Sequence, residues 1–305
     1  MVSLFHSLRH GSTESDGTMN TPPHPMSGST APDDVPALEA ELLVYTGPDR
    51  VVSSEEYTAW ALASPRRSVI VRSHLPRLDA AVGNFQGGEL IAISGLTKHG
   101  KSTFAKTLTR NFLREGTKTV WFSYEMPAQQ FIETCRETMP FYLPLQLVSR
   151  SLRWILRRCI EAKLKYGVDV VMIDHLHYLV DLVVLRNPSL EIGGIIRQLK
   201  TMATTHNLIV FLIAHTTKAL AGDEPTEADM RDSSFIAQEA DTTLMVTRCK
   251  DRATQRYGNR AWLSVRNHRR TGVMGLRIPL VHINGWLEED AHDDSGRVVD
   301  GGGAL

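Results

Sequence analysis

The stretch GLTKHGKS, from Gly95 to Ser102, carries glycine at its first and sixth positions, and a lysine and a serine follow the second glycine. An apolar run, ELIAIS, precedes it, and a helical pattern, TFAKTLTRNFLRE, follows it. Glycines let the backbone curl so that several N–H groups face one anion, and the following helix adds its positive end. The pattern G-x-x-x-x-G-K-[S/T] between a strand and a helix therefore predicts a phosphate-binding loop.

Short apolar, β-prone runs alternate with helical patterns from Glu89 onward. Continuous Val, Ile and Leu runs separated by helices are typical of a parallel sheet covered on both faces. The last two runs have no helix between them, so we expect the sheet to end in an antiparallel hairpin. The sequence thus predicts an α/β fold with a mostly parallel sheet. The runs are ELIAIS, TVWFSYE, DVVMIDH, NLIVFLIAH, TTLMVTR, AWLSVRN and LRIPLVHI.

The segment from Ser149 to Tyr166 is expected to form a helix, because apolar residues recur in it at helical spacing. Its arginines are more in keeping with a solvated face than with a nucleic-acid site. The apolar residues are Leu152, Leu156, Ile160 and Leu164, and the arginines are Arg150, Arg153, Arg157 and Arg158.

The composition excludes several classes of protein. The 305 residues include 34 basic and 34 acidic side chains, so no global field attracts nucleic acid or membrane, and a polyanion must meet a local basic patch. The three cysteines show neither a metal-ligand pattern nor a paired framework. The longest apolar run, Leu208 to Ala214, is too short to span a bilayer. We expect a cytoplasmic protein, or a phage protein acting in the host cytoplasm, with no membrane partner.

The ends of the chain are expected to flank one large domain. Residues 1–40 are rich in Ser, Thr, Gly and Pro and are interpreted as disordered, and 291–305 as a flexible tail. Residues 41–74 form a linker, in which Ser53 or Ser54 is expected to begin a short helix bearing aromatic residues. Those aromatics pack either on their own domain or on a neighbouring subunit. Residues 75–290 form the main domain.

Within the predicted loop, Lys101 is expected to reach the β and γ phosphates of a nucleotide, and Ser102 to ligate Mg²⁺. A second carboxylate near the metal is supplied by Asp174, which follows four apolar residues at the carboxyl end of its strand. Asp169 precedes that run and falls at the wrong end. The loop residues assigned to phosphate binding are Gly95, Leu96, Thr97, Lys98, His99, Gly100, Lys101, Ser102 and Thr103.

Two further side chains end strands at the same edge of the predicted sheet. Glu125 is a candidate for orienting an attacking water, with the alternative that it caps the helix that follows. His215 ends a buried strand, where it serves either as a structural histidine or as a reporter of the γ-phosphate.

The succession of these segments resembles the DnaB-like, superfamily 4 replicative helicases, whose motor is a RecA-like P-loop NTPase domain. The resemblance runs from about Leu75 to Glu289 with its motifs in family order, and the pieces with His215 and RRTGVMG look most like the helicase half of phage helicase-primases. The matching segments are GGELIAISGLTKHGKSTF, WFSYEM, VVMIDHLHYL, IVFLIAHTTK, DMRDSSFIAQEADTTLMV, VRNHRRTGVMG and GWLEE.

This resemblance assigns roles to particular positions. Lys101, with Ser102, matches the P-loop pair, Asp174 the metal-ordering aspartate, Glu125 the water-polarising glutamate, and His215 the γ-phosphate sensor. Arg269 falls on the arginine that such proteins insert into the neighbouring subunit's site, which implies a ring, most naturally a hexamer.

The sequence also departs from the family's pattern. Asn267 stands where the family usually has a lysine, and Arg270 is a rival to Arg269 as the inserted arginine. The span from Glu125 to Asp174 is short for the bacterial members.

The resemblance also places single-stranded DNA against two loops. Lys218 and Arg231 are the best candidates for phosphate contacts and Arg186 a weaker one, each with the alternative of a solvated surface charge.

The sequence is compatible with two functions. The first is an ATP- or other NTP-driven, Mg²⁺-dependent helicase motor on single-stranded DNA, with a separate primase or loader as a further partner. The second is a RecA-like DNA-binding ATPase that acts as a nucleotide-dependent switch or loading factor without unwinding. A small-molecule kinase fits least, since the sequence offers no acceptor-binding lid.

Overall fold

The computed structural model describes residues 35–47, 49–63, 69–135, 139–179, 188–215, 234–250, 254 and 256–291. The chain divides into two compact units, residues 1–65 and 66–305. The helices are α1 (Val35–Leu43), α2 (Ser54–Ala63), α3 (Pro76–Val82), α4 (Lys101–Arg114), α5 (Ala128–Glu133), α6 (Leu152–Tyr166), the 3-10 turn η2 (Leu176–Tyr178), α7 (Pro188–His206) and α8 (Ser234–Glu239).

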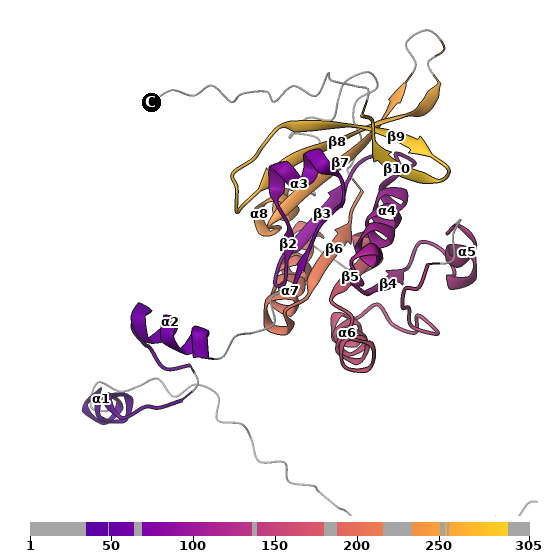
Figure 1. Cartoon of the computed structure of the whole chain (residues 1–305). Helices are drawn as coiled ribbons and strands as arrows, with labels where there is room; N and C mark the ends of the chain where they lie inside the picture. The colour runs from indigo at the N-terminus through magenta and orange to yellow at the C-terminus, as the bar shows by residue number, and fades with distance from the viewer. Residues whose placement is uncertain are drawn as a thin grey trace, which may run out of the picture. The chain divides into compact units, whose positions relative to one another are not determined.

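A sheet of eight strands forms the centre of the second unit, in the order β10-β9-β8-β7-β3-β6-β5-β4 (Figure 1). The five strands from β7 to β4 are mutually parallel. Strands β1 (Ile70–Val71) and β2 (Phe85–Gln86) form a separate antiparallel pair. The strands of the large sheet are β3 (Leu90–Ser94), β4 (Thr119–Ser123), β5 (Val170–Asp174), β6 (Ile209–Ile213), β7 (Thr242–Lys250), β8 (Tyr257–His268), β9 (Leu276–Ile283) and β10 (Trp286–Glu289).

Each central strand buries both of its faces, which explains why the apolar runs are continuous rather than alternating. In β3, Ile91 and Ile93 pack in one core cluster with Phe104 and Phe112 of α4. Leu90 and its neighbour two residues on pack in a second cluster, which includes residues of α6 and α7. Helices therefore cover the sheet on both sides, as predicted.

The antiparallel part of the sheet is larger than the sequence indicated. The predicted hairpin is confirmed as the β8–β9 pair, but β7–β8 and β9–β10 are antiparallel as well. The reason is the short connection between Lys250 and Tyr257, because a parallel return needs a crossover of about a dozen residues or more.

Helix α6 begins and ends where local signals place it. The Ser151 side chain accepts a hydrogen bond from the Trp154 N–H at 3.3 Å, and Gly167 ends the helix in a left-handed conformation. Its buried face differs from the one expected: Ile155 and Cys159 are buried, whereas Leu164 is 81% exposed. The face turned to the sheet thus lies next to the predicted one.

In the first unit, the expected N-cap of the linker helix is confirmed. The Ser53 hydroxyl accepts a hydrogen bond from the Glu56 N–H at 3.1 Å at the start of α2. Helix α1 was not predicted, and it includes residues 35–40 of the segment interpreted as disordered. Residues 1–34 and 292–305 lie outside the described residues. Among the described residues, no helix combines the length and apolar character needed to cross a membrane.

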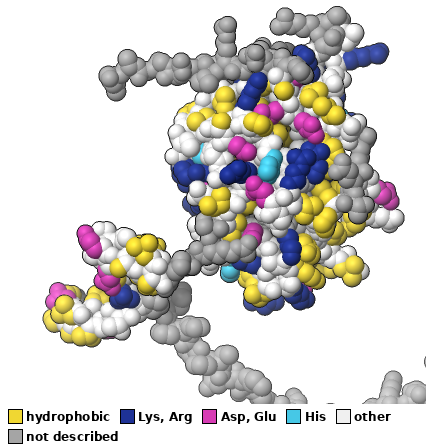
Figure 2. All heavy atoms as spheres, in the orientation of Figure 1, with side chains coloured by type: hydrophobic (Ala, Val, Ile, Leu, Met, Phe, Trp, Pro, Cys, Tyr) yellow, Lys and Arg dark blue, Asp and Glu magenta, His cyan; other side chains and the backbone are white. Residues whose placement is uncertain are grey.

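Charged side chains of both signs are interspersed on the face of the molecule shown in Figure 2. No single-sign field dominates that face, in keeping with the formal net charge of zero.

Candidate active site

The loop after β3 can be built only with glycine at its first position. Gly95 has φ +142°, and a Cβ there would lie 2.3 Å from the carbonyl oxygen of Val246 on the neighbouring strand β7. Gly100 has φ +94° and forms the N-cap of α4, so the loop turns directly into the helix N-terminus. The predicted strand, loop and helix are all present.

Lys101 is the first residue of α4 and is only 5% exposed. Its Nζ donates a hydrogen bond to the carbonyl oxygen of Leu96 at 2.9 Å, across the loop. Burial lowers the pKa of Lys101 to about 8, partly opposed by the negative charges of Asp174 and Glu125. The side chain is a cation held inside the loop, close to two carboxylates.

Asp174, the last residue of β5, meets Ser102 at the start of α4. The Ser102 hydroxyl donates a 2.7 Å hydrogen bond to Oδ2 of Asp174, while Oδ1 is buried with no hydrogen-bond partner among the described residues. Burial raises the pKa of Asp174 to about 6, against the lowering effect of the Ser102 hydrogen bond. Asp169, at the other end of the strand, pairs with Lys163 at 3.2 Å.

The strand register brings three more side chains to this edge. Ser123 of β4, Asp174 of β5 and Ile213 of β6 are aligned partners, so residues just beyond them converge. The ligand atoms of Glu125, His175 and His215 all lie within 4.8 Å of one another.

Glu125 is exposed, and its position argues against a capping role. Helix α5 begins at Ala128, its N-cap is Pro127, and no side chain accepts a hydrogen bond at that cap. The Glu125 carboxylate therefore does not cap α5 and lies at the edge of the sheet.

His215 lies two residues beyond β6, with its ring centroid 4.2 Å from that of His175. Burial, together with the charge of nearby Lys101, lowers the pKa of His215 to about 4.

His175 was not singled out from the sequence. Burial and the two neighbouring histidines lower its pKa to about 3. Both rings are consequently neutral imidazoles at pH 7.

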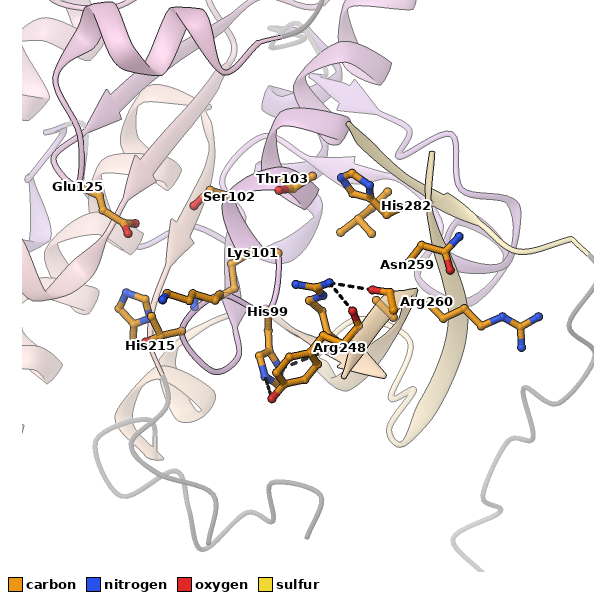
Figure 3. Close-up of a pocket in the computed structure, with 17 residues that line it drawn as sticks. His99, Lys101, Ser102, Thr103, Glu125, His215, Arg248, Asn259, Arg260 and His282 are labelled. Atoms are coloured by element: carbon orange, nitrogen blue, oxygen red, sulfur yellow. Dashed lines mark hydrogen bonds between the residues drawn. The ribbon is translucent and has the colours of Figure 1, made fainter. Parts of the chain in front are cut away.

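A pocket of about 760 Å³ is lined by Lys101, Ser102, Glu125 and His215 and extends well beyond them, whereas Asp174 and His175 are not part of its lining. In Figure 3, Glu125 and His215 lie on one side of Lys101, and Arg248 and His282 lie on the other. Residues 97–103 line the pocket, whereas Gly95 and Leu96 do not. The far wall was missed by sequence reasoning and consists of Arg248, Tyr257, Gly258, Asn259, Arg260, Ala261, His282 and Leu287.

The loop is tied to that wall through His99. Its Nε2 lies 3.3 Å from the Tyr257 hydroxyl, and its Nδ1 accepts a hydrogen bond from the Arg248 N–H at 3.3 Å. The Arg248 guanidinium donates to the carbonyl oxygen of Gly258 at 2.8 Å. Strands β7 and β8 thus hold the far wall against the phosphate loop.

Arg269 and Arg270 follow β8 and lie apart from this pocket's lining. The Arg270 guanidinium donates to the carbonyl oxygens of Val82 and Asn84 and lies 3.4 Å from Glu89. The Arg269 side chain is 54% exposed and donates to the carbonyl oxygen of Gln238 at 2.7 Å.

The candidate DNA contacts lie outside the described residues; they are Arg186, Lys218 and Arg231.

A mixed sheet whose five parallel strands carry a phosphate loop after β3 and an acidic residue at the end of β5 defines a P-loop protein of RecA-like architecture. The model of the family described as the DnaB-like helicase C terminal domain matches residues 71–139 and 143–282. The chain belongs to this family.

Curated relatives include the replicative DNA helicase DnaB of Treponema pallidum (strain Nichols), 25% identical over 217 residues, covering 58% of this chain and 48% of the relative. The same-named protein of Pasteurella multocida (strain Pm70) is 25% identical over 215 residues, covering 56% and 44%. The chain thus spans about half the length of the curated relatives it matches.

Solved structures show the same fold. A DnaB-like replicative helicase, described with its interactions with primase, has a TM-score of 0.63 at 17% identity, covering 83% of this chain and 70% of that one. A second structure, described as an ATPase domain, has a TM-score of 0.64 at 19% identity, covering 78% and 99%.

Proposed function

We propose that this chain is the ATP-hydrolysing motor of a replicative DNA helicase. The observation that carries the proposal is the meeting of Lys101, Ser102 and Asp174, with Glu125 and His215 at the same sheet edge, in a member of the DnaB-like family. A DNA-binding ATPase that acts as a nucleotide-dependent switch or loading factor without unwinding would use the same hydrolytic residues, so the match to the DnaB-like helicase family is what favours the motor.

The residues present fit a magnesium nucleotide. The loop amides, the α4 N-terminus and Lys101 are assigned to an anion cradle, and Lys101, whose Nζ lies across the loop against the Leu96 carbonyl, is assigned to the β and γ phosphates. Ser102 and Asp174 offer the oxygen ligands that Mg²⁺ prefers, and the buried Oδ1 of Asp174 is available to a metal-bound water. When bound, Mg²⁺ neutralises charge on the phosphates.

Glu125 and His215 are assigned to the hydrolytic step. Glu125, exposed just beyond the end of β4, orients a water toward the γ-phosphate. His215 is neutral, so it offers one N–H donor to a phosphate oxygen and changes its contact when that phosphate leaves.

The rest of the nucleotide is placed by the shape of the pocket. Because the triphosphate end is fixed by the loop, we infer that the ribose and base extend toward Arg248, Tyr257 and His282 on the far wall. The pocket is large enough for a whole nucleoside triphosphate.

Arg269 is proposed as the residue that enters the neighbouring subunit's site, in a ring of six. Its side chain is 54% exposed and donates to one backbone carbonyl, that of Gln238, whereas the Arg270 side chain is 38% exposed and donates to the carbonyl oxygens of Val82 and Asn84. An arginine that completes a neighbour's site contributes only when subunits are assembled.

Single-stranded DNA, in the cytoplasm of a cell or of a phage host, is the proposed track. Lys218, Arg231 and Arg186 would contact its phosphates without reading sequence. A separate primase or loader is a further proposed partner, in line with the primase named with the similar DnaB-like structure.

The test is ATP turnover against protein concentration, with and without single-stranded DNA, with mass measured on the same samples. A cooperative rise that coincides with a six-subunit mass, is stimulated by DNA and is accompanied by strand displacement would support the motor. Concentration-independent turnover by a monomer indifferent to DNA would overturn it.

A further inference from the structure

We propose that Glu125, His175 and His215 form a second metal site, selective for a transition-metal ion such as Zn²⁺, and that filling it stops hydrolysis. Binding of the metal stands on the geometry alone. The inhibitory consequence rests on the proposed function, because it requires Glu125 to orient the attacking water.

The three side chains are already close to coordinating positions. Their ligand atoms lie within 4.8 Å of one another, and the two imidazole rings are 4.2 Å apart at 81°. In a tetrahedral zinc site with bonds of about 2.1 Å, neighbouring ligand atoms are about 3.4 Å apart. Small side-chain rotations therefore close the site, without movement of the sheet.

The backbone supplies the rigidity that such a site needs. The three residues follow or adjoin the ends of β4, β5 and β6, which are adjacent parallel strands in register. His175 is 8% exposed and also packs on Tyr178, with ring centroids 4.7 Å apart. A site whose ligands come from a packed sheet edge loses little order on binding a metal.

Unsatisfied nitrogen atoms point to a ligand at this place. Nδ1 of His175 and Nδ1 of His215 are buried, and neither has a hydrogen-bond partner among the described residues. A buried polar atom without a partner is costly, and coordination of a metal by an imidazole nitrogen removes that cost.

The ligand set separates this site from the proposed magnesium site. Two imidazoles and one carboxylate suit Zn²⁺ and similar ions, whereas Mg²⁺ prefers oxygen ligands such as Ser102 and Asp174. Glu125 is exposed, so a fourth position remains open to water. Coordination of the Glu125 carboxylate withdraws it from the attacking water, while the phosphate loop stays free to bind nucleotide.

The binding test uses the full chain without nucleotide, at fixed Mg²⁺, titrated with ZnCl₂ by calorimetry and with Co²⁺ as a visible-absorption probe. The wild-type chain is expected to bind at this site with a tetrahedral Co²⁺ spectrum. His175→Gln is expected to lose the spectrum and to weaken Zn²⁺ binding at least tenfold, and Glu125→Gln, an exposed position, serves as a second variant. His206→Gln, in the last turn of α7, is the matched histidine control.

The outcomes separate the site from the proposed function. Zn²⁺ binding lost in both variants but kept in His206→Gln supports the site, and equal binding by all four proteins overturns it. If the site binds Zn²⁺ and turnover at fixed Mg²⁺ and ATP also falls, the inhibitory role is supported. Binding with unchanged turnover keeps the metal site and overturns the assignment of Glu125 to the attacking water.

Discussion

Arg269 is held by Asp241 of its own chain. Its Nη1 lies 3.7 Å from Oδ1 of Asp241, and its backbone N–H donates to the Asp241 carbonyl oxygen at 2.7 Å. Oδ2 of Asp241 in turn accepts hydrogen bonds from Lys200 at 2.6 Å and from the Leu90 N–H at 2.8 Å. One carboxylate therefore links helix α7, the central strand and the turn that carries Arg269.

Asp241→Asn is expected to destabilise the fold and to lower turnover. The change weakens a charged hydrogen bond at a carboxylate whose side chain is only 13% exposed and leaves Lys200 without its counter-charge. We expect a loss of about 1–3 kcal/mol in the free energy of unfolding, measured by urea denaturation. Turnover is expected to fall because Asp241 no longer holds the turn that carries Arg269 in place.

Glu161→Gln is the matched control for this change. Glu161 pairs with Lys165 at 2.6 Å on the solvent side of α6, where water screens the pair. The Glu161→Gln substitution is expected to leave both the free energy of unfolding and turnover unchanged. Equal stability of the Asp241→Asn and wild-type proteins would contradict the linking role of Asp241.

Glu125→Gln is expected to lower ATP turnover by orders of magnitude while leaving ATP binding intact. The amide keeps the size of the side chain but cannot accept a proton or polarise water as a carboxylate does. Turnover and nucleotide affinity are measured separately, with Glu133→Gln on the exposed side of α5 as the control. Retained turnover would remove Glu125 from the hydrolytic step.

Arg269→Ala is expected to abolish turnover alone but to regain part of it when mixed with Lys101→Ala subunits. The two defects lie in different half-sites, so a mixed ring contains some intact sites. The measurement is turnover across mixing ratios, with the mass of the mixed rings checked. No recovery at any ratio would count against Arg269 acting on its neighbour.

Arg270→Ala provides the contrast. This guanidinium anchors the turn on the carbonyl oxygens of Val82 and Asn84, so we expect a loss of stability rather than a defect that mixing repairs. Repair of Arg270→Ala by Lys101→Ala subunits would exchange the roles of the two arginines.

The residues at the carboxyl ends of the parallel strands could be predicted, because a local apolar run in the sequence marks where each strand ends. Asp174 follows four apolar residues, and a parallel sheet puts every such end at one edge. His175 follows Asp174 directly, but its closeness to Glu125 and His215 depends on the pairing of β4, β5 and β6, which no local pattern encodes. The only sequence feature that indicated His175 was its position directly after Asp174, at the end of a predicted strand.

The far wall of the pocket was not predictable for a similar reason. Tyr257 and His282 are ordinary residues of β8 and β9, and they reach the phosphate loop only because β7 to β10 fold back as antiparallel strands. The sequence between Lys250 and Tyr257 contains no recognisable hairpin motif. Local patterns therefore predicted the strands, the sheet edge that carries the candidate site and the β8–β9 hairpin, but not the antiparallel return from β7 to β8 that brings Tyr257 to the pocket.

Asp174→Asn is expected to stabilise the metal-free fold at pH 7.5 while abolishing turnover. Burial raises the pKa of Asp174 from 3.8 to about 6, so the folded state holds its proton more tightly than the unfolded chain does. The charged carboxylate therefore lowers the free energy of unfolding. This cost is complete above pH 6 and disappears as the pH falls from 6 toward 4, because the folded protein then binds the proton. By linkage, the gain at pH 7.5 is on the order of 1–3 kcal/mol.

The measurement for Asp174→Asn is urea denaturation with EDTA at pH 7.5 and at pH 4, alongside wild type. The stability advantage of the variant should shrink at the lower pH, because the wild-type carboxyl is then neutral as well. Ser102 donates its hydrogen bond equally well to an amide oxygen, so the change isolates the charge. A variant less stable than wild type at pH 7.5 would mean that Ser102 and Lys101 compensate the buried charge in full.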